Sequence, residues 1–148
     1  MSKFIGEYRV KVDDKGRIVF PAAFKATMSA CESGQLIIKK DIFEDCLEMF
    51  TYEQWEKESD EVKSRLNFFN KEHALFWREY MRDRAIVEPD KKLGRISIPK
   101  QLLAQIGADK ELVLAGNDHK IGIWAKERYD SNKLSGENFT ELAQKILG

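Results

Sequence analysis

The side chains of this chain that are best suited to chemistry gather in two copies of one short motif. Residues 13–21 read DDKGRIVFP and residues 90–99 read DKKLGRISIP, so each copy places an arginine directly after a glycine. Five basic and two acidic side chains occupy residues 9–25, and four basic and two acidic ones occupy residues 88–100. Lysine and arginine release counterions when they neutralise nucleic-acid phosphates, and an arginine fork can bond two acceptors of guanine. The pattern predicts DNA binding through Arg9, Lys11, Lys15, Gly16, Arg17, Lys91, Lys92, Gly94 and Arg95.

The same residues also fit a purely structural role. The sequence VDDKGRIV indicates a hairpin tip in which Gly16 takes a positive φ. Asp13, and Asp90 in the second copy, are then turn-stabilising residues whose carboxylates hydrogen-bond the turn backbone. An ion pair between Asp13 and Arg17 would pin the tip without any partner. The residues alone leave a DNA contact and a pinned turn equally open.

Composition limits the other classes of function. The 25 basic and 25 acidic side chains cancel, which argues against a protein that coats nucleic acid over its whole surface. No apolar run approaches the roughly 20 residues of a membrane span. His73 is expected in an amphipathic helix and His119 in a turn. Cys31 and Cys46 lack the spacing of a metal site, so we expect them to be free thiols in a reducing cytosol. Without a nucleophile elbow, P-loop or dinucleotide fingerprint, we expect no enzyme, cofactor, metal site or small-molecule substrate.

The motif is part of a longer internal repeat. Residues 8–55 and 86–129 share an order of strand, glycine turn, strand, short helix, strand, turn and strand, which indicates a duplicated unit. Val10 and Val12 alternate with Arg9 and Lys11, as in a strand with one buried face. Each short helix is expected to have a proline, Pro21 or Pro99, at its first position, and Gly107 is expected to end the second helix.

Two helical segments flank the second unit. Apolar residues recur every three or four positions over residues 52–84, which predicts one amphipathic helix or two helices broken near 67–70. A last helix is expected to begin at Asn138 as its N-cap, with Glu141 three residues on. One face of this helix is an apolar stripe of Phe139, Leu142, Ala143, Ile146 and Leu147. We expect this stripe to dock on the core of its own chain or on a neighbouring subunit.

Three stretches carry a family resemblance: FIGEYRVKVDDKGRIVFPAAFK, the second GRISIP and IWAKERY. Together they resemble the MraZ family of bacterial transcription regulators, and each repeat resembles an AbrB-type swapped-hairpin domain. The resemblance implies an α+β fold. In it, two tandem AbrB-like swapped-hairpin β units form one pseudo-symmetric barrel, with a helical insert and a C-terminal helix. The implied division is 1–55 and 85–130 for the units, 56–84 for the insert and 131–148 for the C-terminal segment.

The resemblance also implies a function. It is sequence-specific binding of double-stranded DNA with tandem repeats upstream of the division and cell-wall gene cluster, usually as a repressor. The protein would be a ring-shaped homo-oligomer in the cytoplasm, associated with the nucleoid. Asp13, Gly16 and Arg17 match the first family motif, and Asp90, Gly94 and Arg95 match the second.

The second copy departs from the first. Asp90 stands four residues before Gly94, whereas Asp13 stands three before Gly16, and Leu93 replaces the lysine found at position 15. The second loop is therefore expected to be longer. Two alternatives stay open: an antitoxin-like interaction module, and an oligomeric scaffold without specific DNA readout.

Overall fold

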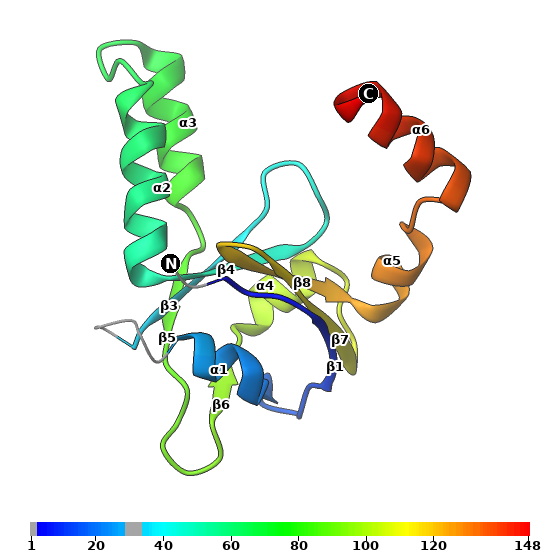
Figure 1. The fold of residues 1–148 in the computed structure, drawn as a ribbon. Helices are drawn as coiled ribbons and strands as arrows, with labels where there is room; N and C mark the ends of the chain where they lie inside the picture. Colours follow the sequence, from blue (N-terminus) through cyan, green and yellow to red (C-terminus); the bar gives the residue numbers. More distant parts are fainter. Residues whose placement is uncertain (1–2, 29–33) are drawn as a thin grey trace.

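Within the described residues, 3–28 and 34–148, the chain forms a six-stranded antiparallel sheet and a two-stranded ribbon (Figure 1). The structure is a computed structural model, and Cys31 lies outside the residues that it describes. The strands are β1 (Glu7–Lys11), β2 (Arg17–Val19), β3 (Leu36–Lys40), β4 (Leu47–Thr51), β5 (Ala85–Val87), β6 (Arg95–Ser97), β7 (Glu111–Asn117) and β8 (Lys120–Ala125). The helices are α1 (Ala22–Met28), α2 (Tyr52–Ser64), α3 (Lys71–Met81), α4 (Lys100–Gln105), α5 (Lys126–Ser131) and α6 (Gly136–Leu147). The fold class is thus α+β, and the element order expected of each unit occurs twice.

Strands of the first unit pair with strands of the second, around an approximate twofold axis. In the ribbon, β2 pairs with β6 and Ile18 lies opposite Ile96. In the sheet, whose strand order is β1-β7-β8-β4-β3-β5, the central pair is β4 and β8. The first strand of each unit pairs with the third strand of the other, β1 with β7 and β5 with β3. The register of these pairings repeats between the units, which supports the duplication read from the sequence.

The strands that flank each glycine turn meet only at the turn itself, where the Asp13 N–H donates to the Arg17 carbonyl and the Asp90 N–H donates to the Arg95 carbonyl. Beyond the turns β1 pairs with β7 and β2 pairs with β6, so the flanking strands do not pair with each other. Ile18 of β2 and Ile96 of β6 are buried in the core, so β2 and β6 pack under the sheet instead of beside β1 and β5. The sheet is also not a closed barrel: β1 and β5 are its edges, and the three-residue strands of the ribbon pair only with each other.

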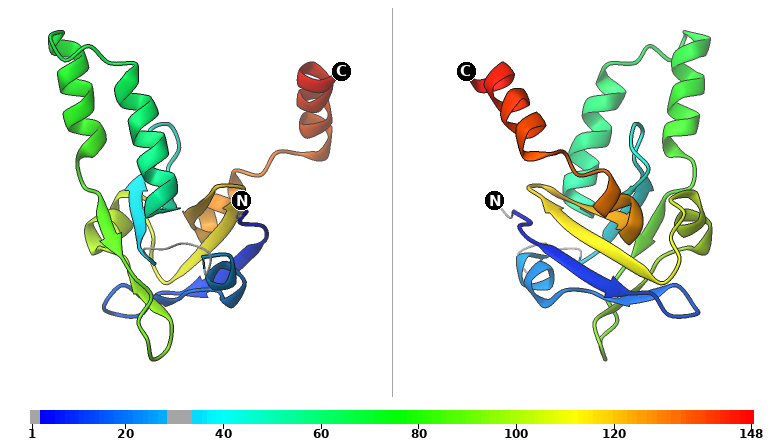
Figure 2. Two further views of the ribbon diagram at one scale, coloured as in Figure 1. Left: turned by 60° about the vertical axis from the view of Figure 1, so that its left-hand side comes forward. Right: turned by 90° about the vertical axis from the view of Figure 1, so that its right-hand side faces the viewer.

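The main core lies between the sheet, the ribbon and the short helices α1 and α4 (Figure 2). Phe24 of α1 is fully buried at its centre. Its ring packs edge-on against Phe4 and Tyr8, with ring centroids 5.6 and 4.9 Å apart, and tilted against Phe20 at 6.1 Å. The period-two pattern of the strands is thereby satisfied, since Val10 and Val12 face this core while Arg9 and Lys11 are exposed.

The helical insert is a pair of helices, which decides between the two alternatives left by the sequence. The Asn70 side chain caps α3 by accepting from the N–H groups of Glu72 and His73. His73 Nδ1 in turn accepts from the Asn67 backbone N–H at 2.9 Å, so this histidine fixes the connection. The base of the hairpin packs against β3 and β4, where Lys39 Nζ lies 3.2 Å from Glu48 Oε1 and 3.6 Å from Glu58 Oε2 of α2. Lys39 and Glu48 are both buried, because the helices close over them.

The C-terminal helix differs from expectation at its start. Ser135 is the N-cap, since its hydroxyl accepts from the Asn138 N–H at 3.1 Å, so α6 begins at Gly136 and Asn138 is inside the helix. Pro99 likewise caps α4 instead of occupying its first position, and Gly107 ends that helix with a φ of 64°. Among the described residues, no helix combines the length and apolar character needed to cross a membrane.

Candidate nucleic-acid interface

Asp13 fixes the first turn. Its Oδ1 accepts hydrogen bonds from the backbone N–H groups of Lys15 and Arg17, both at 2.9 Å, and its Oδ2 accepts from Arg17 Nε at 2.7 Å. The backbone N–H of Gly16 donates to the Asp13 carbonyl at 3.0 Å, and Gly16 has a φ of 81°. A residue with a side chain rarely adopts this conformation. Asp13 and Gly16 therefore set one tight turn geometry, and the ion pair with Asp13 holds the Arg17 side chain against that turn.

Asp90 fixes the second turn in a related way. Its Oδ1 accepts from the N–H groups of Leu93 and Gly94 at 2.7 and 3.0 Å, and its Oδ2 accepts from Arg95 Nε at 3.0 Å. Gly94 has a φ of 66°. The extra residue changes which backbone groups bond to the carboxylate, but the pairing of aspartate with arginine is retained. The longer loop therefore still presents a fixed arginine.

The two turns are also bonded to each other's units. The Phe20 N–H donates to the Gly94 carbonyl at 3.0 Å, and the Ile98 N–H donates to the Gly16 carbonyl at 2.8 Å. Each bond joins a turn glycine of one unit to the strand end of the other. The position of one arginine is thus coupled to the other through the short β2–β6 ribbon.

Both turns project from the same end of the molecule, opposite the α2–α3 hairpin (Figure 2). Lys15, Lys91 and Lys92 are exposed there, while the side chains of Arg17 and Arg95 are 31% and 28% exposed. A further cation, Lys25 of α1, was counted in the basic stretch of the sequence but not among the candidate DNA-binding residues. Its Nζ would lie 3.6 Å from a Cβ placed on Gly94, so the first unit lends a lysine to the second turn. Only tertiary contact brings it there.

The ion pairs leave each arginine able to bond a second partner. Asp13 and Asp90 contact the Nε atoms of Arg17 and Arg95. A guanidinium carries four further N–H donors on its two terminal nitrogens. Holding Nε fixes the plane of the fork, so the pinned turn and the DNA contact, which the sequence presented as alternatives, are compatible.

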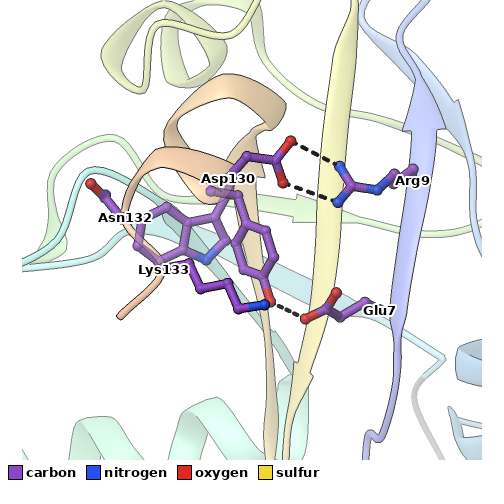
Figure 3. Close-up of a pocket in the computed structure, with 7 residues that line it drawn as sticks. Glu7, Arg9, Asp130, Asn132 and Lys133 are labelled. Carbon is purple, nitrogen blue, oxygen red and sulfur yellow. Dashed lines mark hydrogen bonds and ion pairs between the residues drawn. The ribbon is translucent and has the colours of Figure 1, made fainter. Parts of the chain in front are cut away.

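Two of the candidate DNA-binding residues lie apart from the turns, on β1. Lys11 is exposed near the end of that strand. Arg9 instead faces α5, where its Nη2 lies 3.0 Å from Asp130 Oδ1 (Figure 3). Beside it the Tyr129 hydroxyl donates to Glu7 Oε2, and these side chains line a pocket of about 350 Å³. Arg9 therefore ties α5 to the sheet edge and is not grouped with the turn cations.

The described residues contain no cluster of three or more His, Cys, Asp or Glu side chains that could hold a metal ion. Cys46 is free and buried, and burial raises the pKa of its thiol to about 12, so it stays protonated. His119 follows Asp118 in the tight β7–β8 turn, where Asp118 has a φ of 63°. These groups stand apart from the two turns.

The pKa of Asp90 gives a test of the second turn. The Leu93 N–H, followed by Arg95, favours the charged carboxylate and lowers the pKa of Asp90 from 3.8 to about 2. A depressed carboxyl pKa stabilises the fold above the unfolded value of roughly 4 and loses this contribution as the pH falls through the folded pKa. We expect Asp90→Asn to melt below the wild type at pH 7, with a difference that shrinks between about pH 4 and pH 2. A difference independent of pH would show that the charge of Asp90 plays no part.

The fold and site define a class of protein: an α+β chain of two like units that pair across each other, each with an aspartate-fixed basic turn. The chain belongs to the MraZ family, since a family profile described as "MraZ protein, putative antitoxin-like" matches residues 3–79 and 83–147. It is 38% identical to the "Transcriptional regulator MraZ" of Bacteroides thetaiotaomicron, over 99% of this chain and 94% of that relative. The relative of the same name in Bacteroides fragilis (strain ATCC 25285) is 37% identical over 99% and 92%. That of Christiangramia forsetii is 34% identical over 100% and 95%. The resemblance to the MraZ family drawn from the motifs is confirmed.

Proposed function

We propose that this chain is a DNA-binding regulator of transcription that reads duplex DNA through its two aspartate-fixed turns. The observation that carries the proposal is the arrangement of those turns. A protein without net charge places Lys15, Arg17, Lys91, Lys92 and Arg95 at one end, on two loops that are bonded together through a ribbon. Lysines at such tips suit phosphates, and a fixed arginine suits the edge of guanine.

The finer features are part of the same proposal. The pairing of β1 with β7, of β5 with β3 and of β2 with β6 supports two interlocked swapped-hairpin units, with boundaries near 1–55 and 85–130. We further propose a ring-shaped homo-oligomer in the cytoplasm that represses its promoter and associates with the nucleoid. A ring would present a row of turns to tandem repeats, so that weak single contacts add through effective concentration. The chain would need no catalytic group or cofactor.

Titration of duplex DNA at several salt concentrations tests the proposal. The probes are the sequence upstream of the protein's own gene and a scrambled duplex of equal length. Three exposed lysines on the turns predict that log affinity falls against log salt with a slope of roughly −3 per subunit. Footprints should repeat at a regular spacing on the first probe alone. Equal affinity for both probes would contradict specific readout.

An interaction module without DNA readout is the second candidate. It is favoured by the exposed stripe of α6, where Phe139 and Ile146 are 63% and 69% exposed. The family description, with its word antitoxin-like, points the same way. Such a module would bind neither duplex in the titration.

A further inference from the structure

The helix α6 carries an apolar stripe that its own chain does not cover. None of its side chains is buried, although the structure describes the whole helix. Phe139, Leu142, Ile146 and Leu147 are 63, 43, 69 and 85% exposed. With Ala143 they recur at the i, i+3, i+4 and i+7 spacing by which a helix inserts one face into a groove. An apolar face of this kind requires a partner.

A groove of matching character lies on the α2–α3 hairpin. It has a volume of about 580 Å³ and is lined by the apolar side chains of Val62, Leu66 and Phe76 and by three glutamates, Glu58, Glu61 and Glu72. The lining of the groove on α2 begins at Glu58 and continues through Arg65 and Leu66, beyond the last helical residue, Ser64, so it extends over at least about 9 Å at 1.5 Å per helical residue. Residues 139–147 of α6 span about 12 Å, so the stripe and the groove have similar lengths.

Charge also matches. The groove is acidic, because its three glutamates are opposed by a single arginine, Arg65. On α6, Lys145 lies three residues after Leu142 and borders the stripe, whereas Glu137 and Glu141 lie on the far side of the helix. A helix placed with its stripe in the groove would bring a lysine, and not a carboxylate, to the acidic rim.

The two surfaces do not meet within one chain. The hairpin and α6 project from different sides of the body (Figures 1 and 2). Between α5, which packs on β7 and β8, and α6 there are only four residues, 132–135, and Ser135 caps the helix. A second copy of the chain can supply the missing groove.

We propose that α6 of each subunit docks its Phe139–Leu147 stripe into the α2–α3 groove of the next subunit. The surfaces differ, so the contact is head-to-tail, and such contacts close into rings or run on as filaments. The proposal rests on the self-assembly proposed above and names the surfaces that bring it about.

Two glutamate substitutions and two matched controls test the contact, without DNA. Leu142→Glu places a charge in the stripe, and Gln144→Glu places one outside it. Val62→Glu places a charge in the groove, and Ser64→Glu places one on α2 outside it. Sedimentation of the folded variants, checked by circular dichroism, should show self-association weakened about 30-fold or more by the first member of each pair alone.

Mixing the two disrupted variants gives the decisive result. Leu142→Glu keeps its groove and Val62→Glu keeps its stripe, so an equimolar mixture should form a heterodimer and nothing larger. Wild-type size for either disrupted variant, or a mixture that stays monomeric, would overturn the docking contact. If both disrupted variants assembled like the wild type, only the choice of these two surfaces would be rejected. If the wild type itself were monomeric, the proposed ring would be rejected as well. Neither result bears on DNA binding, which the salt titration measures separately.

Discussion

Gly16→Ala is expected to lower the free energy of unfolding by about 2–4 kcal/mol. The backbone at Gly16 has a φ of 81°, and a Cβ there would lie 2.6 Å from the Ile98 carbonyl oxygen. That oxygen belongs to the backbone of the other unit, so no side chain can move to make room. The two strands cannot separate either, because the Ile98 N–H donates to the Gly16 carbonyl. Denaturant unfolding, followed by the fluorescence of the three tryptophans, measures the change.

Gly94→Ala is the matched control. Its φ of 66° is also positive, but the nearest atom to an added Cβ is Lys25 Nζ, at 3.6 Å. A lysine end can shift, so only the conformational cost of about 1–2 kcal/mol should remain. Equal losses at the two glycines would mean that the close approach of Gly16 to Ile98 has no energetic weight.

Arg17→Ala is expected to weaken specific DNA binding by about 1–3 kcal/mol, a factor of roughly 5 to 150. The loss should fall on the cognate repeat, so that discrimination against unrelated DNA narrows. The fold should remain, because Asp13 keeps its bonds to the backbone N–H groups of Lys15 and residue 17. The ion pair itself is partly exposed, and such pairs contribute little to stability because water and salt screen them. Affinity and thermal stability must therefore be measured together.

Two further variants separate base reading from phosphate contact. Lys15→Ala should weaken all duplexes alike and reduce the salt slope by about one unit. Arg95→Ala should resemble Arg17→Ala if the longer loop reads bases as the first does. If Arg17→Ala lowered the melting temperature by many degrees but left the affinity of the folded protein intact, Arg17 would be a structural pin alone.

Much of the local structure could be predicted from the sequence, because short-range physics determines it. The glycines at 16, 94 and 107 stand where the backbone needs positive φ, and period-two alternation marked β1 as a strand with one buried face. The repeated order of elements and the aspartate and arginine of each turn could also be read from the sequence. The family could be inferred because its motifs are short contiguous stretches of sequence.

Only the tertiary structure decided which of these elements meet. Short alternating strands are alike in their local preferences, so nothing local says that β1 pairs with β7 or that β2 pairs with β6. The residues that separate two such strands in the sequence do not indicate that the strands pair. The sequence likewise does not indicate the pairing of Arg9 with Asp130, 121 residues away, or the position of Lys25 beside Gly94. Lys39 and Glu48 carry charges on neighbouring strands, yet they are buried because the helical hairpin packs against those strands. Side-chain burial and pairing depend on the whole chain, whereas turns and caps depend on a few neighbouring residues.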